Sequence, residues 1–310
     1  MLRVKLLLTG AFKYSADQLS ILESFGYEII FIKDERITLE IDSSDIEAVV
    51  CNGLFQYNDI RKFNSLRFIQ LTSAGIDRVP LDYIRSKEIK LLNANGVYST
   101  PMAEWVVLKI LEIYKKSKSF YEAQSKHIWE KNRNILELTN KRVTILGFGN
   151  VGLAIAKRLK AFDMHVSGIG RHAIKTEFLD EYYLNNDVDT VLKKSDIIIV
   201  TLPYTSETAS FLNDKRLSLL KEESVIINVS RGGIIDESAL KKHLKRGKFL
   251  GVALDVFEKE PLEVENKLWD SDRVIITPHN SFLSDKTNER LFNIIQENLY
   301  SYITENKKKQ

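Results

Sequence analysis

The feature that most constrains this chain is a glycine-rich turn that joins an apolar strand to a helical pattern. Residues 143–152 read Val-Thr-Ile-Leu-Gly-Phe-Gly-Asn-Val-Gly, and the helical pattern continues to about residue 162. In such a turn Gly147 permits a tight strand-to-helix connection, Gly149 lets the backbone approach a pyrophosphate, and Gly152 lets the helix pack closely on the strand. The order strand, glycines, helix therefore predicts a parallel α/β unit with a ligand at the turn.

The first residues of that helix extend the same prediction. Backbone N–H groups at a helix N-terminus are free, and they attract the oxygens of a phosphate. Here Asn150 and Val151 occupy this position, next to the glycines. We therefore expect a bound dinucleotide, while a glycine turn without a ligand and an S-adenosylmethionine site would leave a similar pattern.

Length and composition narrow the class of protein. The 310 residues suffice for two domains of ordinary size, and 44% hydrophobic with 28% charged residues is typical of a soluble globular protein. No apolar run approaches the ~18 residues that cross a bilayer. With 45 basic and 42 acidic residues, the net charge of +3 is too balanced to suggest nucleic acid. We expect a small-molecule partner, with neither nucleic acid nor membrane.

The cysteine content and the spacing of potential metal ligands bear on the location of the protein and on metal binding. Cys51 is the only cysteine, so no internal disulfide can form, and a reducing, cytoplasmic location is expected. We expect Cys51 to be a small buried apolar side chain rather than a nucleophile. No cluster of His, Cys or carboxylate residues has metal-ligand spacing, so no metal is expected.

Short β-rich runs alternate with helical patterns, which predicts parallel sheets covered by helices. The first third of the chain predicts strands near residues 2–8, 27–32, 48–51, 66–71 and 90–93. The remainder predicts strands near 142–146, 164–168, 196–201, 224–228, 249–254 and 274–276, and helices near 151–162, 187–194, 208–220 and 236–246. Two further helices are expected at about 101–118, with Thr100 as N-cap, and at 285–304.

The expected fold class is α/β, with two doubly wound parallel-sheet domains, Rossmann-like or flavodoxin-like, and a cleft between them. Residues 1–98 plus 285–310 would form a discontinuous substrate domain, and residues 99–284 the dinucleotide domain. The helix after Pro101 has apolar residues on nearly all sides, so it needs burial all round, either within the chain or in a homodimer. Trp105 and Trp129 are expected to be packing residues.

Three polar segments follow strands after the glycine motif. They are residues 228–233, 255–262 and 277–280. Ligands of an open α/β sheet bind beyond the carboxyl ends of its strands. Delivered to that edge, Arg231, Glu260 and His279 would make an acid–base and anion-binding set.

At these residues the chain resembles the D-isomer-specific 2-hydroxyacid dehydrogenases. The resemblance covers nearly the whole chain and follows the family's order of motifs. The matching segments are residues 73–77, 95–98 with 103–104, 147–152, 202–208, 230–233, 255–262 and 277–279. The resemblance implies an enzyme that transfers hydride between a nicotinamide dinucleotide and a 2-oxo acid.

It also implies roles for single residues. His279 would be the general acid during reduction, and Glu260 would hydrogen-bond its imidazole and favour the imidazolium. Arg231 would bind the substrate carboxylate and polarise the 2-oxo group. Backbone N–H groups at Ala74 and Gly75 would complete the carboxylate site.

The family's dinucleotide contacts carry over to the remaining motif residues. Asp255 would bind the nicotinamide carboxamide, and Ser230 would lie beside the ring. Leu202, Pro203 and Thr208 lie in the matching segment after a strand and would also contact the dinucleotide. Family resemblance further suggests a homodimer, built partly on the long helix.

The end of the second strand of the dinucleotide domain bears on the choice of cofactor. NAD-binding versions of this fold place an Asp or Glu there, ~20 residues past the glycines, to hold the ribose 2′-hydroxyl. This chain has Gly170 at that position, followed by Arg171. Without the acid a 2′-phosphate is not repelled, and Arg171 supplies an attractive charge. We expect NADP(H) to be preferred, with NAD(H) use as the alternative.

The substrate is less well determined. Leu54 and Phe55 follow a strand of the first domain and are expected to face the cleft, where they would favour a small or branched apolar 2-oxo acid. Packing against the neighbouring helix is the alternative for both. Glyoxylate, hydroxypyruvate or a phosphoglycerate-type substrate remain open, as does a non-catalytic protein that binds dinucleotide to control a partner.

Overall fold

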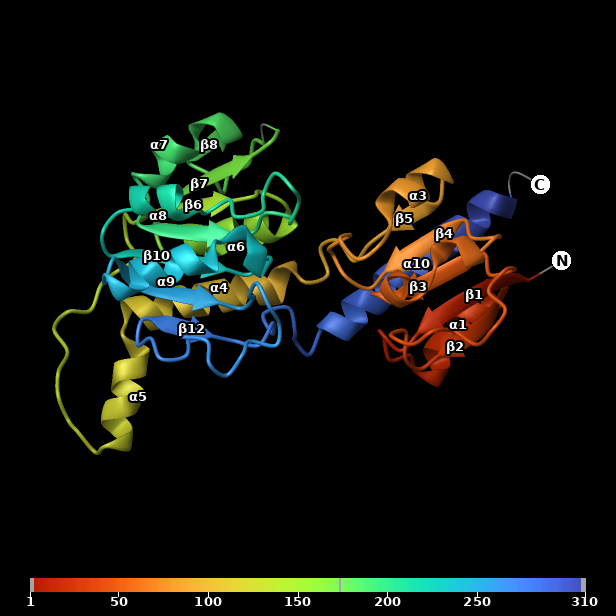
Figure 1. Cartoon of the computed structure of the whole chain (residues 1–310), viewed down its shortest axis with the longest axis horizontal. Coiled ribbons are helices and arrows are strands. Elements are labelled where there is room, and N and C mark those ends of the chain that lie inside the picture. Colours follow the sequence, from red (N-terminus) through yellow and green to blue (C-terminus); the bar gives the residue numbers. More distant parts are fainter. Residues whose placement is uncertain (1–2, 173, 308–310) are drawn as a thin grey trace. The chain divides into compact units, whose positions relative to one another are not determined.

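The structure is a computed structural model that describes residues 3–172 and 174–307. The chain divides into two compact units, Met1–Tyr98 with Ser284–Gln310, and Ser99–Leu283, which we call the first and the second unit. Each unit is a parallel sheet with helices on both faces (Figure 1). The α/β fold class expected from the sequence is confirmed.

The first unit has a five-stranded parallel sheet in the order β2-β1-β3-β4-β5. Its strands are β1 (Val4–Thr9), β2 (Tyr27–Ile32), β3 (Ala48–Cys51), β4 (Phe68–Leu71) and β5 (Lys90–Leu92). Its helices are α1 (Ala16–Ser24), α2 (Leu54–Tyr57), a short 3-10 turn (Ile60–Lys62), α3 (Leu81–Ser86) and α10 (Thr287–Lys307). Helices α1 and α10 cover one face of the sheet, and α2 and α3 cover the other.

The last helix joins this unit through buried polar contacts as well as apolar ones. The hydroxyl of Tyr27, which is fully buried, donates to the Leu299 carbonyl over 2.8 Å. The amide of Asn298 donates to Oε1 of buried Gln70 over 2.7 Å. Because buried polar groups need partners, these bonds fix the register of α10 on the sheet.

The second unit has a seven-stranded parallel sheet in the order β12-β11-β10-β9-β6-β7-β8. Its strands are β6 (Arg142–Leu146), β7 (His165–Gly170), β8 (Glu181–Leu184), β9 (Ile197–Val200), β10 (Ser224–Asn228), β11 (Phe249–Leu254) and β12 (Val274–Ile276). Its longer helices are α4 (Ser99–Tyr114), α5 (Ser117–Ser125), α6 (Asn150–Lys160), α7 (Val188–Leu192), α8 (Asp214–Leu219) and α9 (Glu237–Lys245). Two 3-10 turns complete it, Asn185–Asp187 and Gly232–Ile234.

Helices α4 and α6 pack on one face of this sheet, and α7, α8 and α9 pack on the other. The order of strands reverses between β6 and β9, which is where open α/β sheets bind their ligands. Strand β8 was not predicted, and α8 begins at Asp214 rather than near residue 208 because Asn213 caps it, accepting a hydrogen bond from the Arg216 N–H.

The long helix expected at 101–118 differs from the prediction. Helix α4 begins at Ser99, and a break at Lys116, whose φ is 53°, separates it from α5. Leu108 is 49% exposed, so burial all round is not achieved within the chain. Trp129 is 99% exposed, so its prediction as a packing residue is wrong for the single chain.

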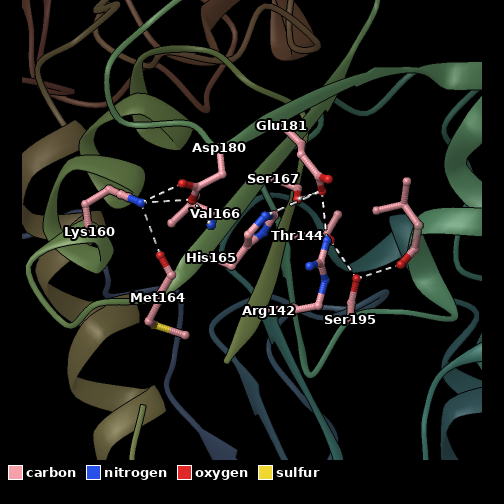
Figure 2. Close-up of polar contacts among 11 residues, drawn as sticks. Arg142, Thr144, Lys160, Met164, His165, Val166, Ser167, Asp180, Glu181 and Ser195 are labelled. Atoms are coloured by element: carbon pink, nitrogen blue, oxygen red, sulfur yellow. Dashed lines mark hydrogen bonds and ion pairs between the residues drawn. The ribbon is translucent and has the colours of Figure 1, made fainter. Parts of the chain in front are cut away.

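Strand β8 is held at the edge of the sheet by a polar network (Figure 2). The Asp180 carboxylate accepts hydrogen bonds from Lys160 and from the Val166 N–H. The Glu181 carboxylate accepts from Arg142 over 2.8 Å and from Ser167 over 3.3 Å. An edge strand as short as β8 gains little from one ladder alone, so these carboxylates supply much of its attachment.

Cys51 is fully buried in the first unit, as expected, and burial raises the pKa of its thiol above the ordinary range. The thiolate is therefore scarce at neutral pH, and Cys51 is not a nucleophile. No helix within residues 3–172 and 174–307 combines the length and the apolar character that a membrane span requires.

We predict that Asp180→Asn destabilises the protein in a pH-dependent way. Burial alone would raise the pKa of Asp180, but the hydrogen bonds from Lys160 and Val166 lower it below 3.8. A lowered pKa stabilises the fold above the unfolded-state value and loses that effect as the pH falls through the folded-state value. The variant should lose about 1 kcal/mol at neutral pH, and less as the pH falls below 3.8.

Urea unfolding of both proteins at several pH values measures this difference. Asp272→Asn is the control, because the Asp272 carboxylate is 98% exposed and pairs with Lys118 only at 3.6 Å. A loss for Asp180→Asn that stays constant across the acid range would contradict the role of the charge.

Candidate functional site

The glycine turn after β6 has the local geometry that its sequence predicts. Gly147 has φ +89°, and a Cβ there would lie 2.7 Å from the Leu202 nitrogen, so both conformation and space require glycine. A Cβ on Gly152 would lie 3.0 Å from the Gly147 carbonyl oxygen, which reflects the close packing of α6 on β6. A Cβ on Gly149 would meet nothing within 4 Å, so the space beside this backbone is open. The turn therefore fits a pyrophosphate.

The neighbouring segments complete this edge of the sheet. Gly149 is the N-cap of α6, Asn150 is exposed and Val151 is half-buried. After β9, Leu202 is nearly buried and Pro203 is exposed. The Thr208 hydroxyl donates to the Pro203 carbonyl over 2.6 Å, which closes the loop that follows β9.

The end of β7 is formed by buried Gly170 and exposed Arg171. No acidic side chain stands at either position. Arg171 lies at the same edge of the sheet as the glycine turn, because the parallel strands β6 and β7 are paired and end together.

The histidine and the glutamate expected to act together are in contact. Nδ1 of His279 lies 2.8 Å from Oε2 of Glu260, and the two side chains are 31% and 37% exposed. The other oxygen of Glu260 accepts a hydrogen bond from the Phe257 N–H over 3.1 Å. The Phe282 ring meets the imidazole edge-on at 5.8 Å. These contacts fix the ring orientation and leave Nε2 as the nitrogen that can meet a substrate.

The charge state of Glu260 follows from its surroundings. Burial alone would raise the pKa of its carboxyl, but hydrogen bonds from His279 and Phe257 and the positive charges of His279 and Arg231 lower it. Glu260 is therefore an anion at neutral pH, and an anion beside an imidazole favours the imidazolium.

Arg231 is positioned by the turn after β10. Buried Asn228 accepts hydrogen bonds from the Ser230 N–H and hydroxyl, and its amide donates to the Arg231 carbonyl over 3.0 Å. The Arg231 Nη1 donates to the Ser230 carbonyl over 2.8 Å. A Cβ on Gly232 would lie 1.8 Å from the Phe257 carbonyl carbon, so only glycine lets this turn meet the loop that carries Glu260.

Asp255 is fully buried and organises the loop that contains His279. Its carboxylate accepts from the Thr277 hydroxyl over 2.5 Å, from the Asn280 N–H over 2.8 Å and from the Ser281 N–H over 2.9 Å. Its backbone carbonyl accepts from the His279 N–H over 2.8 Å. The structure thus gives Asp255 a positioning role, since both carboxylate oxygens are engaged by the loop.

The residues expected to bind substrate from the first unit lie at the carboxyl ends of its strands. The carbonyls of Ala74 and Gly75 accept hydrogen bonds from Asn93 and from the Ser73 hydroxyl, which fixes the loop after β4. Leu54 is fully buried in the core of this unit.

Phe55 is half-buried and meets the Phe63 ring edge-on at 5.4 Å. Leu54 therefore lies in the core of the first unit, whereas Phe55 keeps part of its surface exposed. A side chain with no exposed surface, such as that of Leu54, has little area to offer a ligand.

Sequence reasoning missed the residues that hold these loops in place. Buried Glu35 accepts from the Thr9 hydroxyl, over 2.7 Å, and from the N–H groups of Asn52 and Gly53. Glu35 lies outside every motif of the sequence, so nothing there indicates its role. Asn228 begins the polar segment 228–233, but the hydrogen bonds that it makes within the turn are seen only in the structure. Within the described residues, no three His, Cys, Asp or Glu side chains gather in a way that could hold a metal ion.

Comparison with known proteins extends the likeness to both units. A sequence profile described as "D-isomer specific 2-hydroxyacid dehydrogenase, NAD binding domain" matches residues 107–281. A hydroxypyruvate reductase of Thermotoga maritima is 33% identical over 250 residues, which are 80% of this chain and 80% of the relative.

Two solved structures show the same likeness. A D-isomer specific 2-hydroxyacid dehydrogenase from Xanthobacter autotrophicus Py2, in complex with NADPH and MES, has a TM-score of 0.81 and 26% identity, covering 98% of this chain and 96% of that one. The D-lactate dehydrogenase of Aquifex aeolicus, complexed with NAD and lactic acid, has a TM-score of 0.79 and 26% identity, covering 96% and 95%.

Proposed function

The chain belongs to the D-isomer specific 2-hydroxyacid dehydrogenases, and we propose that it reduces a small or branched 2-oxo acid to the D-2-hydroxy acid. Members of this family are oxidoreductases that act on CH–OH donors with a nicotinamide dinucleotide. We propose further that this chain prefers NADP(H). One observation carries the proposal. The His279 imidazole lies 2.8 Å from the Glu260 carboxylate, and the turn that carries Arg231 packs through Gly232 against the Phe257 backbone of the loop that carries Glu260.

Each of these side chains has a task that fits its chemistry. Arg231 binds the substrate carboxylate with its planar fork of donors and polarises the 2-oxo group. His279, held through Nδ1 by anionic Glu260, donates a proton from Nε2 to the carbonyl oxygen as negative charge develops there. Backbone N–H groups of Ala74 and Gly75 also bind the substrate carboxylate in this proposal. In the reverse direction His279 accepts the proton.

Residues of the second unit would hold the dinucleotide, which supplies the hydride when it is bound. The turn residues Gly147 and Gly149 and the N–H groups of Asn150 and Val151 suit the pyrophosphate. The sides of this dinucleotide site would be formed by the neighbouring residues Gly152, Leu202, Pro203 and Thr208. Ser230 lies on the same strand-end turn as Arg231, and buried Asp255 keeps the loop of His279 in place. Because Asp255 is fully buried and both of its carboxylate oxygens accept hydrogen bonds from that loop, we propose that it supports the nicotinamide site through the loop rather than by binding the carboxamide directly.

Two classes of 2-oxo acid are candidates for the substrate. An apolar substituent on the substrate is expected from Leu54 and Phe55, and because Leu54 is fully buried only half-buried Phe55 has surface to contact it. The related protein from Thermotoga maritima is named a hydroxypyruvate reductase, which supports glyoxylate or hydroxypyruvate as a second candidate class. A panel of 2-oxo acids assayed with NADPH separates these classes. A protein that binds NADPH tightly and reduces none of them would instead be a dinucleotide sensor.

We also propose a homodimer. In Figure 1, α5 and the segment after it extend away from the rest of the second unit. The exposed apolar side chains of this region are Leu108 of α4, Phe120 and Tyr121 of α5, and Ile128 and Trp129 after it. Contiguous exposed apolar surface is typical of an interaction site, and a second copy of the chain offers the same surface in return.

We predict that the purified chain sediments as a dimer and that Trp129→Lys with Tyr121→Lys shifts it to the monomer, because charge on an apolar interface opposes association. Sedimentation velocity over a range of concentrations measures this. A wild-type chain that remains monomeric at the highest concentration would contradict the proposal.

We predict that His279→Ala lowers kcat by roughly 10²–10⁴, which is the usual contribution of a positioned acid or base. Affinity for the dinucleotide should change little, since His279 acts on the substrate. His127→Asn is the control, because His127 is an exposed imidazole with φ 55° and asparagine tolerates that conformation. Steady-state kinetics with a reactive 2-oxo acid decide, and an unchanged kcat would remove His279 from the mechanism.

We predict that kcat/KM is higher with NADPH than with NADH by about 10-fold or more, the value of a hydrogen bond to a charged group. Arg171→Asp should lose NADPH activity selectively, because it replaces an attractive charge with a repulsive one. Lys245→Asp, which makes the same charge change at an exposed site on α9, is the control. Equal values for the two dinucleotides in the wild type would contradict the preference.

A further inference from the structure

The position that normally carries the ribose-binding acid is filled by another side chain. A Cβ built on Gly170 would lie 2.3 Å from the hydroxyl oxygen of Tyr182. Real Cβ atoms do not approach another heavy atom so closely, so Asp or Glu at this position would displace Tyr182. The Tyr182 hydroxyl therefore occupies the space that an acidic side chain at position 170 would need.

The pairing of β7 with β8 explains how Tyr182 comes to lie there. Tyr182 is opposite Gly168 in this parallel ladder, so its side chain lies on the face that Gly168 and Gly170 leave bare. A Cβ on Gly168 would meet Cδ2 of Tyr182 at 3.1 Å, and the hydroxyl end of the ring lies over Gly170. The tyrosine thus runs along β7 toward its carboxyl end.

Neighbouring contacts hold the ring in this direction. The Phe148 ring, in the glycine turn, meets the Tyr182 ring edge-on at a centroid distance of 6.1 Å and an angle of 85°. The carboxylates of Asp180 and Glu181 anchor the start of β8 through Val166, Lys160 and Arg142 (Figure 2). The hydroxyl therefore occupies a defined place next to the turn that would bind the pyrophosphate.

The chemistry of a phenol at this place differs from that of a carboxylate. A carboxylate accepts hydrogen bonds from the ribose 2′-hydroxyl and repels a 2′-phosphate. A phenol is neutral and can donate a hydrogen bond to a phosphate oxygen. Burial raises the pKa of Tyr182 above 10, so the proton needed for donation is kept at neutral pH.

We propose that Tyr182 is a specificity-determining residue whose hydroxyl donates a hydrogen bond to the 2′-phosphate of the adenosine ribose, in the place that an acid takes in NAD-binding relatives of the fold. The inference rests on the proposed use of a nicotinamide dinucleotide and adds a second recognition group to Arg171. The Tyr182 phenol would donate a directed hydrogen bond to the 2′-phosphate, and the Arg171 guanidinium would attract it by its positive charge.

The test is equilibrium binding of NADPH and NADH to wild type and to Tyr182→Phe, measured by isothermal titration calorimetry in the absence of substrate. The variant keeps the ring and loses only the hydroxyl. We expect its Kd for NADPH to rise about 10-fold, as for a lost hydrogen bond to a charged group, and its Kd for NADH to stay within about twofold. Tyr183→Phe is the matched control, because the adjacent Tyr183 side chain packs on the opposite face of the sheet.

The ratio of the two affinities separates this inference from the proposed function. A wild type that binds both dinucleotides equally overturns the NADP preference. The role of Tyr182 is tested separately, by the change in the ratio of the two Kd values between wild type and Tyr182→Phe. An unchanged ratio, or equal losses for both dinucleotides, overturns the inference even if wild type prefers NADPH.

A pair of further variants tests the coupling in the other direction. Gly170→Asp alone should weaken binding of both dinucleotides, because the new side chain collides with Tyr182. Gly170→Asp combined with Tyr182→Ala makes room for the acid, and we expect it to bind NADH at least about 10-fold more tightly than NADPH. If the single variant binds NADH as tightly as the double variant does, Tyr182 does not occupy the acid's place, and the inference is overturned.

Discussion

The buried carboxylate of Asp255 is the constraint on which the rest of the candidate site depends. A buried polar group is costly unless hydrogen bonds satisfy it, and here the Thr277 hydroxyl and the N–H groups of Asn280 and Ser281 donate to the Asp255 side chain. Those donors come from the loop after β12, so these hydrogen bonds fix the loop. The loop then holds His279 at φ 51°, a conformation that few non-glycine residues adopt without support.

A second constraint joins this loop to the arginine. Gly232 lets the turn after β10 approach the Phe257 backbone more closely than any side chain would permit. The Phe257 N–H in turn donates to one oxygen of the Glu260 carboxylate, and Nδ1 of His279 forms a hydrogen bond with the other oxygen. The three groups of the proposed reaction are therefore brought together by backbone contacts between strand ends. Positions fixed in this way need little rearrangement when charge develops on the substrate.

Much of the fold could be predicted because its signals are local. The start of α1 is an example, because Ser15 and Gln18 have the spacing of a capping box: the Ser15 side chain accepts from the Gln18 N–H, and the Gln18 side chain accepts from the Ser15 N–H. The alternation of apolar strands and helices predicts both parallel sheets. Gly147 and Gly152 meet the steric requirements expected of them, and the space beside Gly149 is open. Strand β8 escaped prediction because Glu181–Leu184 is short and its attachment depends on distant partners such as Arg142.

The parts of the site that were missed depend on contacts between distant residues. Full burial of Leu54 and full exposure of Trp129 are set by the packing of whole units, which the types of the two residues do not reveal. The sequence shows Gly170 and Arg171 in place of an acid, but not that Tyr182 occupies the vacated space. Glu35 and Asn228 likewise act only through partners that the fold brings to them.

The proposed reaction is tested most directly by a crystal structure of the protein with the reduced dinucleotide and oxamate, an unreactive analogue of a 2-oxo acid. We expect the Arg231 guanidinium to bind the oxamate carboxylate and Nε2 of His279 to lie within hydrogen-bond distance of its carbonyl oxygen, while Nδ1 stays on Glu260. An oxamate bound through other side chains, with Arg231 and His279 both turned away from it, would contradict the roles proposed for these two residues.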